Sequence, residues 1–127
     1  MRFIPTKIHG VLDYITVVTG LALPYLLNWN RDATILLNGA ALAVLLSSLI
    51  TRYELSVVRW LPMKGHLMLD ALNGALLIAA PLLWLKEDTT TSTILIALGI
   101  TELVVVLLSK THSPVEDQSY TQDRTSI

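Results

Sequence analysis

The stretch RFIPTKIHGVLD at residues 2–13 returns as RWLPMKGHLMLD at residues 59–70, without a gap between the aligned copies. The Arg, Pro, Lys, His, Leu and Asp positions are identical, and an aromatic residue follows each Arg. The same spacing holds further along the chain, because Pro24 and Pro81 are 57 residues apart, as are the two copies of the motif. We therefore interpret the chain as a tandem duplication.

The composition indicates a membrane protein. Hydrophobic residues make up 53% of the 127-residue chain and charged residues only 15%, against roughly 25% charged residues in soluble domains. Four stretches are almost free of charge, at about 8–29, 33–50, 66–85 and 92–109. About 20 helical residues cross the hydrocarbon core of a bilayer. A soluble bundle would need a polar face on each helix, and ALAVLLSSLI (41–50) has none.

The predicted fold is therefore all-α, with four transmembrane helices. NWNRD (28–32) and KEDTTTS (86–92) are short polar turns, so the spans form two antiparallel hairpins. Repeat 1 runs over about 2–51 and repeat 2 over about 59–111. Because each repeat has an even number of spans, the two repeats are expected to be parallel, related by a pseudo-two-fold axis along the membrane normal.

The remaining segments are polar. Residues 1–111 are expected to form the membrane domain, and the polar segment 112–127 a disordered cytoplasmic tail. Between the repeats, ELSVVRWL (54–61) is expected to lie along the membrane surface as a short amphipathic helix. Asp88 or a following Thr is expected to cap the fourth span.

Positive charge predicts the orientation. Six basic residues lie on the side that carries both termini: Arg2, Lys7, Arg52, Arg59, Lys64 and Lys110. Only Arg31 and Lys86 lie on the opposite side. By the positive-inside rule both termini are cytoplasmic in a multi-pass protein of the inner (cytoplasmic) membrane.

Further residues are expected at the two membrane surfaces. Each repeat begins with basic anchors and a helix-starting proline, namely Arg2, Pro5 and Lys7, then Arg59, Pro62 and Lys64. Three tryptophans are predicted at the interfaces, with Trp29 and Trp84 outside and Trp60 inside.

The duplicated hairpin resembles the SPW-repeat family of small bacterial membrane proteins, in which a helical hairpin with a Ser-Pro-Trp tripeptide occurs twice. The resemblance extends to about residue 111 and rests on IPTKIHGVLDY (4–14), YELSVVRWLPMKGHLMLD (53–70) and the intramembrane Glu102. The tripeptide positions read LPY (23–25) and APL (80–82), so both copies keep only the proline. The resemblance implies a four-span topology and no particular activity.

Ionisable residues inside the predicted spans are the candidate functional residues. Such residues are costly in a bilayer and need a partner or a function. The sequence has five of them, His9, Asp13, His66, Asp70 and Glu102. His and Asp four residues apart share one helix face. We expect all five to point into the bundle as one intramembrane polar cluster in its cytoplasmic half, with Glu102 within reach of one His–Asp pair.

Three functions remain open for this cluster. The favoured one is a structural hydrogen-bond network in a protein with a structural or partner-binding role. The second is a proton or small-ion relay. The third is a metal site in a membrane oxidoreductase, with His9, Asp13, His66 and Asp70 as ligands, since imidazole and carboxylate suit Fe, Mn or Zn.

Other functions have no support in the sequence. There is no glycine-rich phosphate loop and no Cys, and the basic residues are explained as anchors, so no nucleic-acid partner is expected. No enzyme activity and no cofactor are predicted. The expected partners are the lipid bilayer and a second copy of the chain or another membrane protein. Ala71, Ala75 and Ala79 form a small-residue face suited to helix–helix contact.

Overall fold

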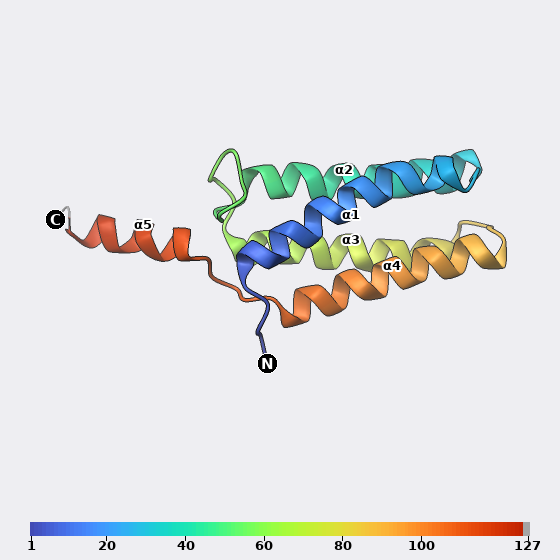
Figure 1. The fold of residues 1–127 in the computed structure, drawn as a ribbon. Coiled ribbons are helices and arrows are strands. Elements are labelled where there is room, and N and C mark those ends of the chain that lie inside the picture. The colour runs from blue at the N-terminus through green and yellow to red at the C-terminus, as the bar shows by residue number, and fades with distance from the viewer. Residues whose placement is uncertain (126–127) are drawn as a thin grey trace.

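The computed structural model describes residues 1–125 of the chain, and these residues form helices joined by short connections (Figure 1). The helices are α1 (Thr6–Leu26), α2 (Arg31–Ile50), α3 (Met63–Leu83), α4 (Thr89–Leu108) and α5 (Pro114–Thr125). The first four are each long and apolar enough to cross a membrane. The all-α prediction is confirmed, and the chain is an integral membrane protein with four spans.

The four spans pack as two hairpins, α1 with α2 and α3 with α4, and the contact between α2 and α3 joins the hairpins. Both connections within the hairpins lie at one end of the bundle, and the N-terminus and the start of α5 lie at the other end (Figure 1). The two repeats therefore run parallel, as the even number of spans predicts.

Side chains cap two of the spans, and the cap of α4 was predicted from the sequence. Asn30 caps α2 by accepting a hydrogen bond from the Ala33 amide, and Asp88 caps α4 by accepting one from the Thr91 amide. The Thr91 hydroxyl also donates to Asp88, at 2.6 Å. These hydrogen bonds from Thr91 lower the pKa of the Asp88 carboxyl below its usual range, because they favour its charged form. The expectation of a cap at Asp88 is confirmed.

The second hairpin depends on two glycines. Gly74 of α3 and Gly99 of α4 face each other so closely that a Cβ built on Gly99 would lie 2.5 Å from the Gly74 carbonyl oxygen. A Cβ on Gly74 would lie 2.9 Å from the Gly99 carbonyl oxygen. The absence of both side chains lets the two backbones touch, as small residues do in membrane helix pairs.

The end of the bundle with the termini is held together by two backbone bridges that repeat each other. Ile4 lies beside Ser109, and Leu61 lies beside Thr51. Ile4 and Leu61 each precede the proline that begins a span, whereas Thr51 and Ser109 are the C-caps of α2 and α4. Each repeat thus pairs its first residues with the end of the other repeat, in the pattern of a pseudo-two-fold axis.

The connection between the repeats differs from the prediction. Residues 54–61 form no helix and fold instead as an irregular loop. The amides of Val57 and Val58 both donate to the Leu49 carbonyl, at 3.0 and 2.9 Å, so the loop folds back on the end of α2. Hydrogen bonds to the exposed carbonyls at the helix end replace those that a surface helix would make internally.

The predicted disorder of the tail is wrong for the described residues, because α5 begins at Pro114. Ser113 and Glu116 form a capping box, with Ser113 Oγ accepting from the Glu116 amide and Glu116 Oε2 accepting from the Ser113 amide. Glu116 Oε1 also accepts from the Met63 amide at 2.6 Å. One carboxylate therefore caps both α5 and α3 and anchors the start of the tail. Residues 126–127 lie outside the described part of the chain.

Candidate metal centre

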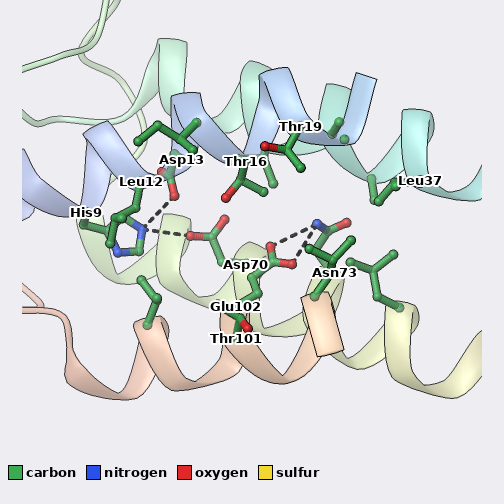
Figure 2. A pocket seen from close by; sticks show the side chains of 18 residues that line it. His9, Leu12, Asp13, Thr16, Thr19, Leu37, Asp70, Asn73, Thr101 and Glu102 are labelled. Atoms are coloured by element: carbon green, nitrogen blue, oxygen red, sulfur yellow. Dashed lines mark hydrogen bonds and ion pairs between the residues drawn. The ribbon is translucent and has the colours of Figure 1, made fainter. Parts of the chain in front are cut away.

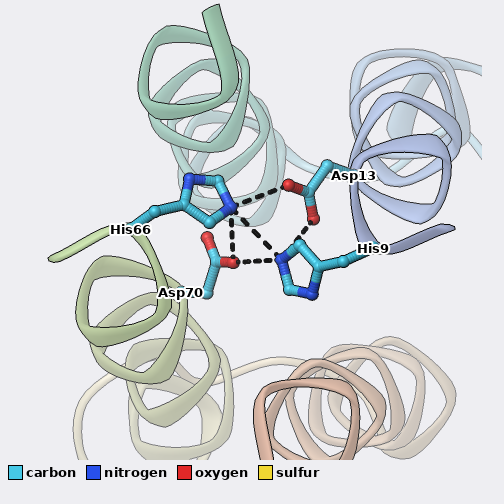
Figure 3. A group of neighbouring side chains, drawn as sticks. All are labelled: His9, Asp13, His66 and Asp70. Carbon is cyan, nitrogen blue, oxygen red and sulfur yellow. Dashed lines mark hydrogen bonds and ion pairs between the residues drawn. The ribbon is translucent and has the colours of Figure 1, made fainter. Parts of the chain in front are cut away.

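The two copies of the sequence motif meet in the centre of the bundle. His9 and Asp13 come from α1, and His66 and Asp70 come from α3; each pair lies on one helix face, four residues apart. The four side chains point toward one another between the hairpins (Figure 3). All four residues are buried, with exposed fractions between 0% and 6%. We call these residues the tetrad.

Each imidazole contacts both carboxylates through its Nε2 atom. His9 Nε2 lies 3.3 Å from Asp13 Oδ1 and 3.0 Å from Asp70 Oδ2. His66 Nε2 lies 2.8 Å from Asp13 Oδ2 and 3.1 Å from Asp70 Oδ2. The two Nε2 atoms are 3.2 Å apart. The His–Asp pairs are therefore not two separate helix anchors, because each His contacts the Asp of the other repeat as closely as its own.

The outer nitrogen of each imidazole is bound to a hydroxyl group at a helix end. His9 Nδ1 lies 2.7 Å from Ser109 Oγ, and that hydroxyl donates its proton to the Val105 carbonyl at 2.6 Å. His66 Nδ1 lies 2.9 Å from Thr51 Oγ1, which donates to the Ser47 carbonyl at 2.5 Å. Each hydroxyl has one proton, which it donates to the backbone carbonyl. Its oxygen must therefore accept its other hydrogen bond from the imidazole N–H. Both Nδ1 atoms therefore carry a hydrogen.

This arrangement determines what the inner nitrogens can do. With hydrogen on Nδ1, a neutral imidazole has only a lone pair on Nε2. Two lone pairs and two carboxylates would then face one another at 2.8–3.3 Å with no hydrogen between them. Such contacts between acceptors are repulsive in a buried site. Either a metal ion or protons shared between the imidazoles and the carboxylates must therefore occupy the centre of the tetrad.

The four His–Asp contacts lie near the ligand spacing of a tetrahedral metal site. Ligands at roughly 2.0–2.1 Å from a tetrahedral ion lie about 3.3 Å from one another. The His–Asp contacts, which involve both oxygens of Asp13, measure 2.8–3.3 Å. One ligand atom from each tetrad residue can be chosen so that all four lie within 4.8 Å of one another. Two carboxylates also balance the charge of a divalent ion, so the occupied site would be neutral within the bilayer.

The hydrogen bonds to the tetrad are of the kind that hold the ligands of metal sites in place. Metal-binding histidines usually donate their second ring N–H to an acceptor, which holds the ring in place. Ser109 and Thr51 accept such bonds here. Ser48 supports the carboxylate side, because its hydroxyl donates to Asp13 Oδ2 at 2.9 Å. The three hydroxyl groups leave the Nε2 and carboxylate lone pairs directed inward.

Glu102, predicted to point into the same cluster, is not one of the four residues whose ligand atoms converge. Its carboxylate accepts from Asn73 Nδ2, at 3.0 Å to Oε1 and 3.3 Å to Oε2. Glu102 lies on α4 and Asn73 on α3, so the bond closes within the second hairpin. Both residues line a cavity of about 280 Å³ beside the tetrad (Figure 2). Glu102 therefore lines the same cavity as His9, Asp13 and Asp70 and is hydrogen-bonded to Asn73.

The predicted anchors have different environments. Arg2 donates to the carbonyls of Val106 and Ser109, at 2.8 and 2.7 Å, and so binds the end of α4. Lys7, Arg59 and Lys64 are exposed. Pro5 and Pro62 occupy the N-cap positions of α1 and α3, one residue before the predicted first turn.

The three tryptophans also differ in how exposed they are. Trp60 and Trp84 are exposed, as aromatic side chains at an interface are. Trp29 instead packs partly against the apolar cluster at the far end of the bundle.

Sequence reasoning missed the hydroxyl residues around the tetrad. Ser48, Thr51 and Ser109 lie at the ends of α2 and α4, where no periodic pattern relates them to the histidines. It also missed Tyr53, whose fully buried ring lies 5.9 Å from the His66 ring. Burial raises the pKa of the Tyr53 hydroxyl far above its ordinary value, so this group stays neutral.

Comparisons with known proteins give no assignment. No family model matches the chain. No curated protein and no solved structure matches it either.

Proposed function

We propose that this membrane protein binds one divalent transition-metal ion in the tetrad, where the ion holds the two hairpins together. The observation that carries the proposal is the convergence of two Nε2 atoms and two carboxylates, with both Nδ1 hydrogens directed outward to hydroxyl acceptors. Zn²⁺ fits best, because it accepts both imidazole and carboxylate ligands and prefers four of them in a tetrahedron.

The proposed role is structural and not catalytic. Catalytic zinc sites keep a coordination position for water or substrate, whereas structural sites are closed by four protein ligands. The tetrad supplies four ligands, two from each hairpin. The ion would thus act as a cross-link between α1 and α3. This proposal combines the structural role favoured from sequence with the metal site that the sequence analysis left open as its third alternative, without the oxidoreductase activity.

Metal analysis of the purified protein tests this proposal. Protein prepared in detergent without chelator is expected to contain about one divalent ion per chain. The Asp70→Asn and His66→Gln variants are expected to lose most of it, because removing one ligand or a supporting residue typically costs 10–100-fold in affinity. Cobalt substitution adds a spectroscopic readout, since tetrahedral Co²⁺ absorbs visible light far more strongly than octahedral Co²⁺.

Glu102→Gln is the matched control, because Glu102 is a carboxylate beside the same cavity but outside the tetrad. This variant is expected to keep the metal and the cobalt spectrum. Wild-type protein that holds no stoichiometric metal, and gains no thermal stability when Zn²⁺, Co²⁺, Fe²⁺ or Mn²⁺ is added, would contradict the proposal. The tetrad would then hold two protons, as two imidazolium–carboxylate pairs.

The alternative of proton or ion conduction has less support. A conducting path needs polar groups along the whole membrane thickness. Beyond the cavity, the described residues of the bundle form an apolar cluster of Leu37, Ala40, Leu77 and Leu95. Leu37 and Leu77 also line the cavity at that end. The tetrad therefore lies in one half of the bundle, whereas the core of the other half holds this apolar cluster, and Asn38 there is hydrogen-bonded to the Gly20 carbonyl and the Tyr25 hydroxyl.

We further infer that both termini are cytoplasmic and that the protein lies in the bacterial inner membrane, as the SPW-repeat resemblance implies. The six basic residues named above all lie at the end of the bundle with the termini. Reporter fusions at residue 30 or 88 are expected to face away from the cytoplasm, and a fusion at residue 127 to face it. Fusions at 30 and 127 that report the same side would contradict this orientation.

A homodimer remains part of the proposal. Ala75, on the small-residue face predicted to contact a second copy, is exposed in the single chain. Such a surface allows close contact between helices in the membrane.

A further inference from the structure

The cavity beside the tetrad has a mixed lining and lies between the two hairpins. Its polar residues include Thr16, Thr19, Asn73 and Glu102 (Figure 2). Apolar residues from all four spans line the rest of it: Leu12, Ile15, Leu37, Val44, Leu77, Leu98 and Val105. A volume of about 280 Å³ holds a small organic molecule.

The mouth of the cavity faces the lipid between α1 and α4. Ile15 and Thr16 on α1 and Thr101 on α4 line the cavity and are also exposed on the outside of the bundle. These residues lie near the middle of their spans, away from both ends. A ligand would therefore enter sideways from the bilayer, which requires it to be soluble in lipid.

The charges of the lining residues indicate the kind of ligand. Asp13 and Asp70 are balanced inside the tetrad, whether a divalent ion or two imidazolium protons occupy it. Among the described residues, Glu102 accepts its side-chain hydrogen bonds from the neutral amide of Asn73. No Lys or Arg is among the described lining residues. An ionised carboxylate within a bilayer needs a positive partner, because it is otherwise costly to keep charged.

We propose that the cavity binds a lipid-soluble organic monocation, an ammonium group with an aryl or alkyl substituent, which pairs with Glu102. The ammonium group would lie beside the Glu102 carboxylate, and the apolar substituent would contact the leucine-rich wall. In the absence of the ligand, a proton on Glu102 would serve as the neutralising charge. This proposal does not depend on which cation occupies the tetrad.

Benzyltrimethylammonium is the probe, and neopentylbenzene is its uncharged counterpart of the same shape. Equilibrium dialysis against the protein in lipid nanodiscs, at neutral pH, measures both. The cation is expected to bind at least about tenfold more tightly to the protein than the neutral molecule, after subtraction of empty nanodiscs, because a charge pair is strong in a low dielectric. Equal binding of the two probes would overturn the proposal.

Variants locate the bound cation. Glu102→Gln is expected to reduce the affinity for benzyltrimethylammonium about tenfold or more, because it removes the charge that pairs with the ammonium group. Thr16→Phe is expected to block the mouth of the cavity and so to reduce the binding of both probes. Asp32→Asn, which removes an exposed carboxylate at the far end of the bundle, is expected to change nothing. Full binding by Glu102→Gln, or no binding by the folded wild type, would refute the proposal. The metal content of Glu102→Gln tests the tetrad separately.

Discussion

Replacing Asp13 and Asp70 by leucine together is expected to cost little more stability than replacing either one alone. Each single change removes a ligand from the tetrad and leaves inward-facing groups without a partner, which costs about 3–5 kcal/mol for a buried charge pair. Asp13→Leu also leaves the Ser48 hydroxyl without its acceptor. If the tetrad holds a cation as proposed, loss of one carboxylate releases it, so the second change removes much less.

Reversible unfolding in detergent, followed by circular dichroism, measures this double-mutant cycle. We expect a coupling energy at the upper end of the usual 0.5–3 kcal/mol for residues in contact. Asp13→Asn is the conservative partner and is expected to retain more stability than Asp13→Leu, because its amide oxygen still accepts the Ser48 hydrogen bond. Asp32→Leu, an exposed change of the same type, serves as the control. If the stability effects of Asp13→Leu and Asp70→Leu simply add, each His–Asp pair anchors its own helix independently, and the joint tetrad is contradicted.

Gly99→Leu is expected to separate α3 from α4 and to destabilise the protein by about 3 kcal/mol or more, because overpacking at a rigid contact is costly. The obstacle is backbone, which a side-chain rotation cannot relieve: the new Cβ would meet the Gly74 carbonyl oxygen at 2.5 Å. The shift would also disturb the bond between Asn73 on α3 and Glu102 on α4. Gly99→Ala is expected to show a smaller effect of the same sign.

Gly39→Leu is the matched control, because a Cβ at Gly39 meets nothing within 4 Å and the residue faces outward on α2. A leucine there adds apolar surface toward lipid and replaces a weak helix former, so stability is expected to be equal or slightly higher. Unfolding experiments on the three variants in the same detergent give the comparison. Equal stability of Gly99→Leu and Gly39→Leu would contradict the close contact between α3 and α4.

The sequence and the tertiary packing determined different features of this protein. Hydropathy and the 57-residue repeat predicted the four spans, the two hairpins and the parallel repeats, because these features depend on residue type and local period alone. The helical period also placed His9 with Asp13, and His66 with Asp70, on shared faces. The Ser113-x-x-Glu116 capping box is a helix signal that the sequence of the tail contains. The polar composition of the tail nevertheless led to the prediction of disorder.

The tertiary structure alone decided which groups meet across helices. A helix period shows which residues share a face, but it does not show how far that face lies from another helix. That separation is set by contacts such as the Gly74–Gly99 approach, which decides that Glu102 bonds to Asn73 and not to the tetrad. The hydroxyls of Thr51 and Ser109 reach the histidines only because each helix ends beside them. The sequence by itself placed the two His–Asp pairs on their helix faces, and only the packing of the hairpins brought the four side chains together.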